Sequence, residues 1–260
     1  MNISTIEKYM TKWNQYTYRQ GIMFMFMPKE DREKCLWVMD GLGILDKKMT
    51  GESVQGLLNI DEGFAGGIYF TEVFEKWANG KFLSPASFIL CLIREYEMTG
   101  LPFDGNIIGT VGRGLRGLPS FIREIDLADK LKLTLPNSSC IRTRAIEDMK
   151  DHTDVRLEYN GIFYRVFSYQ NTGHSLKNMV SKILGERGST PNGHCLLCPF
   201  NYLSKEYAKD VYGWRLHNER YLQKVKKILD SYQPLQYATI SKKSFSEISQ
   251  IVKNICVIYK

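Results

Sequence analysis

A two-residue turn, Asn160-Gly161, places the strongest constraint on how this chain folds. It separates two stretches in which apolar and polar residues alternate, 155–159 and 162–170. Asn-Gly is the preferred pair for the tight turn of a β-hairpin, because both positions need a positive φ. Pairing outward from the turn gathers one face, made of Val155, Leu157, Tyr159, Ile162, Tyr164 and Val166. We expect this face to be buried, and Ser168 and Gln170 to continue it at the end of the second strand.

A helix is expected on the N-terminal side of this hairpin, over residues 119–131. Its apolar residues recur at helical spacing and form one stripe, made of Phe121, Ile122, Ile125, Ala128 and Leu131. Glu124 falls within that stripe. The other face is expected to carry the charged residues Arg123, Asp126 and Lys130. A carboxylate on an inward face costs free energy unless it meets a cation, a metal ion or hydrogen-bond donors, so Glu124 is a candidate functional residue.

The other elements of the second half follow from start and stop signals in the sequence. In chain order they are a weak strand within 131–144, a helix from Ser175 to Gly185, a short strand over 194–198, a helix over 221–229, and a helix from the capping box of Ser244 and Glu247 to Ile255. Together with the first helix and the hairpin, they predict an α/β (α+β) fold. The order helix, three strands, helix, strand is followed by extra C-terminal helices.

The first hundred residues have a different pattern, in which helical segments predominate. The clearest one begins at Ser84-Pro85, a cap followed by proline at the first helical position, and ends at Gly100. A glycine-rich, basic stretch over 109–117 then fits either a helix with close packing or a loop. We therefore expect two parts, a helical N-terminal region over 1–103 and a basic α/β domain over 104–260.

Charge is distributed unevenly along the chain. Residues 1–100 carry 11 Lys and Arg against 13 Asp and Glu, whereas residues 101–260 carry 24 against 15. A one-sided positive excess is what a polyanion-binding surface needs, because each phosphate contact releases counterions. Nucleic acid is therefore the expected partner, with DNA favoured over RNA, and Arg113 and Arg116 are candidates for contacts with its backbone. The N-terminal region is expected to pack, or to dock a protein partner or a second copy of the chain.

Several protein classes do not fit the sequence. No uninterrupted apolar stretch approaches the roughly 18 residues of a spanning helix, so no membrane partner is expected. The first residues lack the basic-then-apolar order of a secretory signal. Six dispersed cysteines are too few for a disulfide scaffold, and most are expected to be core residues in a reducing compartment. These features predict a cytoplasmic protein.

The order of elements from residue 119 to about residue 200 resembles the core of the restriction-endonuclease-like nucleases, the PD-(D/E)xK family. The resemblance rests on that order and on a few positions, and it implies a nuclease-like fold. In this family an acidic residue on the first core helix, an acid before the second core strand and an acid-x-lysine pair on the third strand surround a divalent cation. The carboxylates hold Mg²⁺, and the lysine helps a water molecule attack phosphorus.

Four residues of this chain occupy the corresponding places. The resemblance implies that Glu124, as the helix acid, and Asp154, as the strand acid, hold Mg²⁺. The acid-x-lysine pair is replaced by Ser168-Tyr169-Gln170. Serine is a poor magnesium ligand and glutamine brings no charge, although some members of the family use glutamine there. Strict alternation also puts Asp154 on the opposite face from Ser168 and Gln170, so a bulge or bend is required to bring them together.

The same residues also have a structural interpretation, and two other kinds of site have weaker support. Asp154 can cap the start of its strand while Ser168 and Gln170 form hydrogen bonds at the sheet edge. Cys195 and Cys198 form one Cys-x-x-Cys beside His194, but a structural zinc site normally needs four ligands. A Cys–His nucleophile pair has nothing in the sequence to orient it. Near the presumed nuclease site, the candidates for phosphate contacts are His174, Lys177, Lys182 and Arg187.

Two function classes therefore stay open. The first is a metal-dependent nuclease of restriction or defence type, with Mg²⁺ as cofactor and with the catalytic residues Glu124, Asp154, Ser168 and Gln170. The second is a non-catalytic subunit with a nuclease-like fold, which binds nucleic acid or docks a partner. Converging carboxylates with room for an ion favour the nuclease, whereas a packed, dry cluster favours the binding module.

Overall fold

The chain divides into two compact units. A computed structural model describes residues 30, 31, 33, 34, 73, 76, 84–98, 105–143, 153–185, 193–211, 214–234 and 243–259. The first unit comprises residues 1–121 and 212–214, and the second comprises residues 122–211 and 215–260. Most of the predicted N-terminal region lies outside the described residues. No helix of the described part is long and apolar enough to cross a membrane.

Two helices precede the sheet in the chain. α5 spans Pro85–Met98 and begins where the sequence predicts, with the Ser84 hydroxyl accepting from the Ser87 backbone N–H at 3.2 Å. α6 spans Gly105–Thr134 and is therefore longer than predicted. The glycine-rich stretch is helical, and Pro119 lies inside α6 instead of at its start. Proline lacks the N–H that would continue the helical ladder, which is why the sequence suggested a boundary there.

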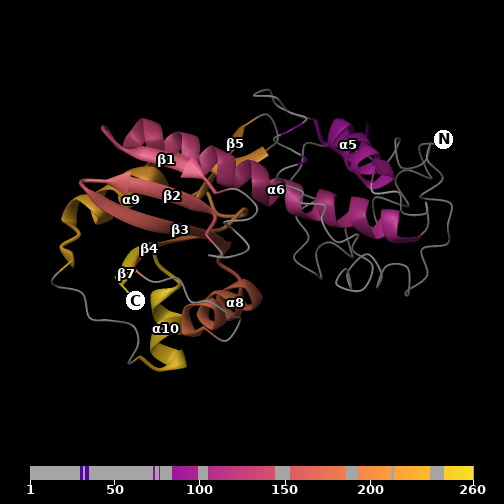
Figure 1. Ribbon diagram of the computed structural model, residues 1–260. Helices are drawn as coiled ribbons and strands as arrows, with labels where there is room; N and C mark the ends of the chain where they lie inside the picture. Colours follow the sequence, from indigo (N-terminus) through magenta and orange to yellow (C-terminus); the bar gives the residue numbers. More distant parts are fainter. Residues whose placement is uncertain are drawn as a thin grey trace. The chain divides into compact units, whose positions relative to one another are not determined.

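A mixed five-stranded sheet forms the centre of the second unit (Figure 1). Its strands are β1 (Ser139–Arg142), β2 (Val155–Tyr159), β3 (Ile162–Gln170), β4 (His194–Phe200) and β7 (Cys256–Tyr259), in the spatial order β1-β2-β3-β4-β7. β3 and β4 are parallel, and the other neighbouring pairs are antiparallel. The predicted hairpin is confirmed, since Tyr159 pairs with Ile162 and the turn residues Asn160 and Gly161 have φ values of 51° and 73°.

The parallel pair needs a crossover, which α8 (Gly173–Leu184) supplies. The cap of this helix is Thr172, so the prediction that Ser175 begins it is wrong by one helical turn. The predicted end is confirmed, because Gly185 adopts the left-handed conformation with φ 82°. α8 also contributes Met179, Val180 and Ile183 to the core.

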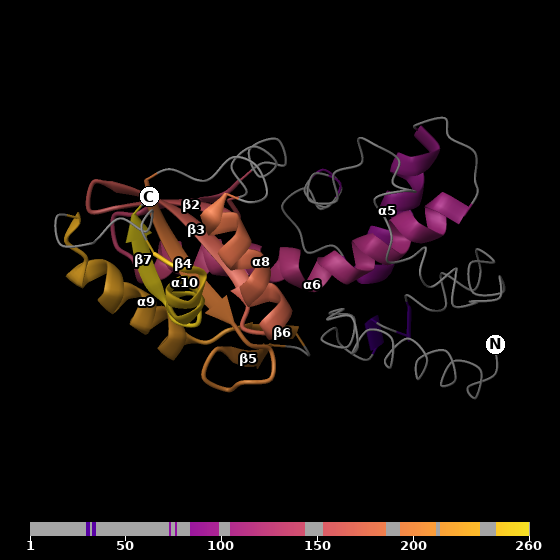
Figure 2. The same cartoon turned by 90° about the horizontal axis from the view of Figure 1, so that it is seen from below.

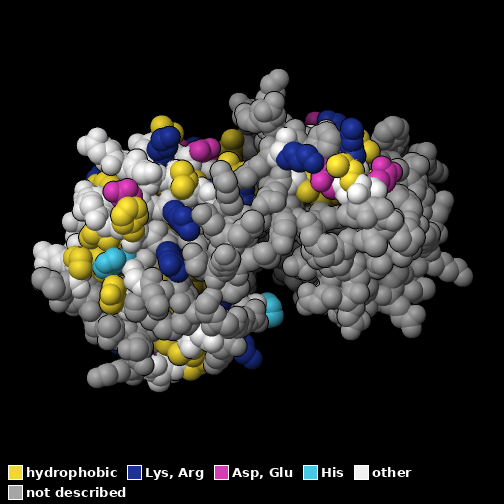
Figure 3. Space-filling view, in the orientation of Figure 1, with side chains coloured by type: hydrophobic (Ala, Val, Ile, Leu, Met, Phe, Trp, Pro, Cys, Tyr) yellow, Lys and Arg dark blue, Asp and Glu magenta, His cyan; other side chains and the backbone are white. Residues whose placement is uncertain are grey.

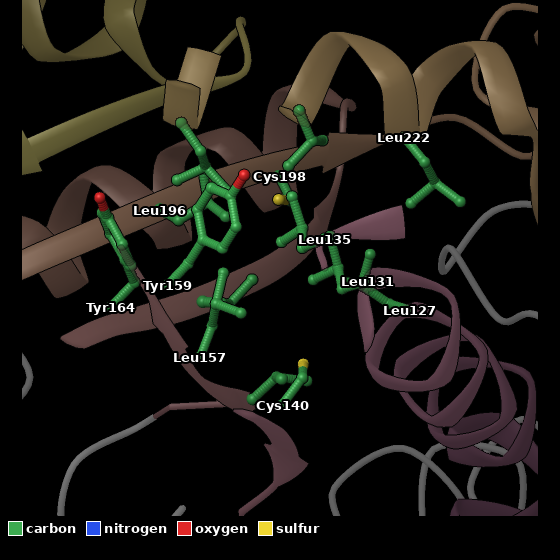
Figure 4. Packing of buried hydrophobic residues seen from close by; sticks show 14 of the residues in the cluster. Leu127, Leu131, Leu135, Cys140, Leu157, Tyr159, Tyr164, Leu196, Cys198 and Leu222 are labelled. Atoms are coloured by element: carbon green, nitrogen blue, oxygen red, sulfur yellow. The ribbon is translucent and has the colours of Figure 1, made fainter. Parts of the chain in front are cut away.

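Helices cover both faces of the sheet, as Figures 1 and 2 show. α6 and α9 (Glu219–Ser231) pack on one face, where the hairpin residues that were predicted to be buried lie. Figure 4 shows Leu127 and Leu131 of α6 close to Leu157 of β2 in this core. α8 and α10 (Phe245–Ile251) pack on the other face, against Phe167, Tyr169, Cys195, Leu197 and Ile258. The second unit thus has helix, sheet and helix layers.

The C-terminal segment differs from the prediction. The capping box of Ser244 and Glu247 is present, but α10 ends at Ile251 and Ile255 lies beyond it. The last residues form β7, whose Ile258 pairs with Cys195 at the edge of the sheet. Tertiary pairing with β4 outweighs the helical spacing of the isoleucines. A two-stranded sheet of β5 (Ala208–Val211) and β6 (Trp214–His217) was also not predicted.

Candidate functional site

A buried arginine on α6 lies at the centre of the predicted site. The Arg123 side chain is only 2% exposed, so the prediction that it faces solvent is wrong. Its Nη1 donates to the Tyr202 hydroxyl at 3.2 Å, and its Nη2 donates to the Ser168 carbonyl at 3.1 Å. The guanidinium also lies 5.4 Å from the Phe200 ring centre and 5.6 Å from that of Tyr202. Carbonyl acceptors and aromatic faces together make an arginine stable at this depth.

The Tyr202 hydroxyl is part of the same buried cluster. Burial raises the pKa of Tyr202 to about 12, although the nearby Arg123 opposes this rise. The phenol therefore stays neutral and serves as a hydrogen-bond acceptor for the guanidinium. Tyr202 also packs edge-on against Phe200, with ring centres 4.7 Å apart.

Glu124 meets cations, which is one of the ways in which an inward carboxylate can be stabilised. Its side chain is 15% exposed and lies between two guanidinium groups. Oε1 is 3.9 Å from Nη2 of Arg123, and Oε2 is 3.9 Å from Nε of Arg142 on β1. Positive charge therefore already surrounds this carboxylate.

Asp154 lies at a bend just before β2, and this bend changes which face its side chain reaches. The Asp154 N–H donates to the Val166 carbonyl at 3.2 Å, although Val155 is the residue opposite Val166 in the register. Two successive residues therefore face one residue of β3, as in a β-bulge. Oδ2 of Asp154 then accepts from the Ser168 backbone N–H at 2.6 Å. The carboxylate thus takes the place of a backbone carbonyl beyond the end of the β2–β3 ladder.

The two residues expected to stand in for the acid-x-lysine pair are on β3. Ser168 is buried, and its backbone joins Asp154 on one side to Arg123 on the other. Its Oγ is buried without a hydrogen-bond partner in this structure. Gln170 is the last residue of β3 and is half-buried. The structure thus links Glu124, Ser168 and Asp154 through the guanidinium of Arg123.

The other predicted contact residues are spread over several elements. His174 and Lys177 are exposed on α8, and Lys182 is half-buried in its last turn. Arg113 and Arg116 lie in α6, but their side chains fall outside what the structure describes. Arg187 lies outside the described residues.

The cysteines of the Cys-x-x-Cys motif cannot share a metal ion. Cys195 belongs to the core under α8 and α10, whereas Cys198 belongs to the core under α6 and α9. Their thiols therefore lie on opposite faces of the sheet, because side chains three residues apart on a strand alternate. Burial also raises the pKa of both the Cys198 and the Cys256 thiols. Within the described ranges, no group of three or more His, Cys, Asp or Glu residues could hold a metal ion.

A second buried polar cluster joins α6 to the start of α9. Oδ2 of Asp126 accepts from the His217 backbone N–H at 3.0 Å and lies 3.2 Å from Nδ1 of the same residue. Lys130 pairs with Asp126 at 2.7 Å and donates to the His217 carbonyl. Burial alone would raise the pKa of Asp126, but the hydrogen bonds from His217 and Lys130 hold it below its usual value. Asp126 and Lys130 thus fix the helix to this strand instead of facing water, as the sequence had suggested.

We expect stability to fall in mild acid because of His217. Burial lowers the pKa of this residue to about 4, and its Nε2 is buried without a partner that could accept from a proton there. The unfolded chain protonates histidine near pH 6.5, so stability is complete above that pH. It should decline by about 3 kcal/mol as the pH falls from 6.5 to about 4. Urea denaturation across this range measures the decline.

The matched variant for this prediction is His217→Gln. Burial also lowers the pKa of His194, which therefore adds a smaller decline of the same sign. The variant should have a visibly shallower pH dependence than the native protein, whatever its absolute stability. Equal slopes for the two proteins would contradict the assignment to His217.

Comparison with known proteins gives no match of any kind. No family model matches the chain, and no curated protein or solved structure does so. Function is therefore inferred from the charge distribution and from the contacts around Arg123.

Proposed function

We propose that this chain is a nucleic-acid-binding protein with a restriction-endonuclease-like core that does not cut through a bound metal ion. The observation that carries this proposal is the buried Arg123 guanidinium, which joins Ser168 to Tyr202 and lies beside Glu124. In the family that the sequence resembles, the corresponding residues surround a divalent cation. Here an arginine of the chain itself supplies the positive charge.

The order of elements supports the choice of core. α6, β1, β2, β3, α8 and β4 follow one another in the chain, and this is the order on which the resemblance rests. The bulge at Asp154 adds support, because it brings the strand acid to Ser168 as the resemblance requires. Both observations concern the scaffold and leave the chemistry to be decided by the side chains.

The side chains do not fit a divalent cation. An ion bound to Glu124 would lie beside the guanidinium groups of Arg123 and Arg142, each 3.9 Å from the carboxylate. Unit charges of the same sign about 4 Å apart repel by about 4 kcal/mol in a partly buried setting, and a divalent ion doubles this value. Asp154 already accepts a short hydrogen bond from the backbone, and Ser168 offers only a weak ligand. This packed cluster favours the binding module over the nuclease.

The charge of the chain favours nucleic acid as the ligand. The excess of Lys and Arg falls after residue 100, where 24 basic residues stand against 15 acidic ones. Contacts of such residues with phosphates supply most of the non-specific affinity of a protein for nucleic acid.

A cleavage assay separates this function from the nuclease. The native protein is incubated with mixed DNA and RNA substrates in MgCl₂ or MnCl₂, and the products are resolved by size. We expect retarded, intact nucleic acid and no new fragments. Cleavage that Asp154→Asn abolishes would establish the nuclease, the second candidate, which the proximity of Asp154 to Ser168 favours. Cleavage that survives in the variant would indicate a contaminating enzyme.

A further inference from the structure

Two arginines face each other on the outer side of the hairpin. Arg156 of β2 is the direct partner of Arg165 on β3. Their neighbours Leu157 and Tyr164 are buried under α6 and α9, so the two arginines lie on the other face of the sheet. Like charges directly opposite in an antiparallel pair destabilise a sheet. Such a pair is better explained by an anionic ligand than by folding.

Large apolar side chains lie next to this arginine pair. Ile141 of β1 is the partner of Arg156 and is 57% exposed. Phe163 precedes Arg165 by two residues on the same face and is 71% exposed. An open hollow of about 740 Å³ lies over these strands and is lined by all four residues. Arginine and exposed aromatic residues thus alternate on one surface.

The described helices leave this part of the sheet open. α8 and α10 lie on the same face, but they pack against Phe167, Tyr169, Cys195, Leu197 and Ile258 towards β4 and β7. Figure 3 shows Lys, Arg and hydrophobic side chains next to one another where Figure 1 places β1, β2 and β3. We call the group Ile141, Arg156, Phe163 and Arg165 the hairpin patch.

We propose that the hairpin patch binds single-stranded nucleic acid, an inference that rests on the proposed function and names its ligand. The two guanidinium groups would hold one phosphate, which matches the forked geometry of arginine. Phe163 would stack on the base of the adjoining nucleotide. Residues two apart on a strand are separated by about 7 Å, which is the order of the distance from a phosphate to its base.

The exposed ring favours a single strand over a duplex. Bases in a duplex are already stacked on one another, so a side chain on a flat sheet meets only backbone and groove edges. Bases of a single strand can stack on an aromatic ring, and a basic groove beside such rings is the usual design of proteins that bind single strands. Glu158, the partner of Phe163, repels phosphate at that end and so favours one direction of the strand.

Binding of a labelled oligothymidylate, followed by fluorescence anisotropy, tests this inference. The double variant Arg156→Gln/Arg165→Gln should bind at least about 10-fold more weakly, and each lost phosphate contact should reduce the slope of log affinity against log salt by about 0.7. Phe163→Ala should weaken binding by about 5- to 100-fold with little change in slope, because stacking carries no charge. Matched controls are Arg220→Gln and Leu203→Ala, which alter exposed residues outside the patch and should bind normally.

Each outcome gives a decision. If the native protein and the patch variants bind with equal affinity, the inference is overturned while the proposed function stands. If the native protein fails to bind any nucleic acid at low salt, both are overturned. Patch variants that lose self-association but keep their affinity for the oligonucleotide would assign the patch to protein docking and would also overturn the inference. Because all four side chains lie on the outer face, unchanged thermal midpoints should show that the variants remain folded.

Discussion

Arg123→Ala is expected to destabilise the second unit by about 3–5 kcal/mol. The change leaves the Ser168 carbonyl and the Tyr202 hydroxyl without their donor and opens a cavity beside Phe200. Unsatisfied buried polar groups and cavities are among the few causes of losses this large. Urea denaturation followed by far-ultraviolet circular dichroism measures the change in the free energy of unfolding.

Two further variants make this test specific. Arg220→Ala removes an exposed arginine of α9 and should change stability by no more than about 0.5 kcal/mol. Arg123→Lys keeps the charge but not the two separate donors, so it should lie between the native protein and Arg123→Ala. A loss below about 1 kcal/mol for Arg123→Ala would mean that Arg123 does not hold this cluster together.

Asp154→Ala should cost about 1.5–3 kcal/mol in the absence of any metal ion. The carboxylate accepts from the Ser168 backbone N–H, and alanine would leave that buried donor without a partner. Asp154→Asn keeps an oxygen acceptor and should cost clearly less. Denaturation of the three proteins in EDTA gives the comparison.

The opposite result identifies a different role for Asp154. A carboxylate kept only to bind a cation gains nothing from the folded state when the cation is removed. In that case both substitutions would leave stability in EDTA unchanged or would raise it. Equal stability of the native protein and Asp154→Ala would therefore contradict the capping role.

The sequence predicts the sheet well where local chemistry agrees with tertiary packing. Asn160-Gly161 specifies the turn, and alternation specifies which hairpin residues are buried. The prediction was wrong where packing overrides a local signal. Pro119 suggested a helix start but lies within α6, and Ile255 continued a helical spacing but precedes the edge strand β7.

The candidate site was predicted only in part. The need for a bend at Asp154 followed from strand alternation, and the structure has one there. The central role of Arg123 was missed, because helical periodicity placed it with the solvent-facing charges. Its acceptors come from Ser168 and Tyr202, which are distant in the sequence, and no local pattern reveals such partners. The proximity of Arg123 to Glu124 in the chain was the only available signal.

The most direct test of metal-independent nucleic-acid binding is a salt titration of affinity, in EDTA and again in MgCl₂. The protein is titrated into a labelled oligonucleotide, and log affinity is plotted against log salt concentration. We predict tight binding at low salt in EDTA, with a steep negative slope of about 0.7 per phosphate contact on a single strand. Mg²⁺ should act only as a competing cation and weaken binding. Binding that requires Mg²⁺, or that is absent or insensitive to salt in EDTA, would contradict a binding protein whose site is held by Arg123.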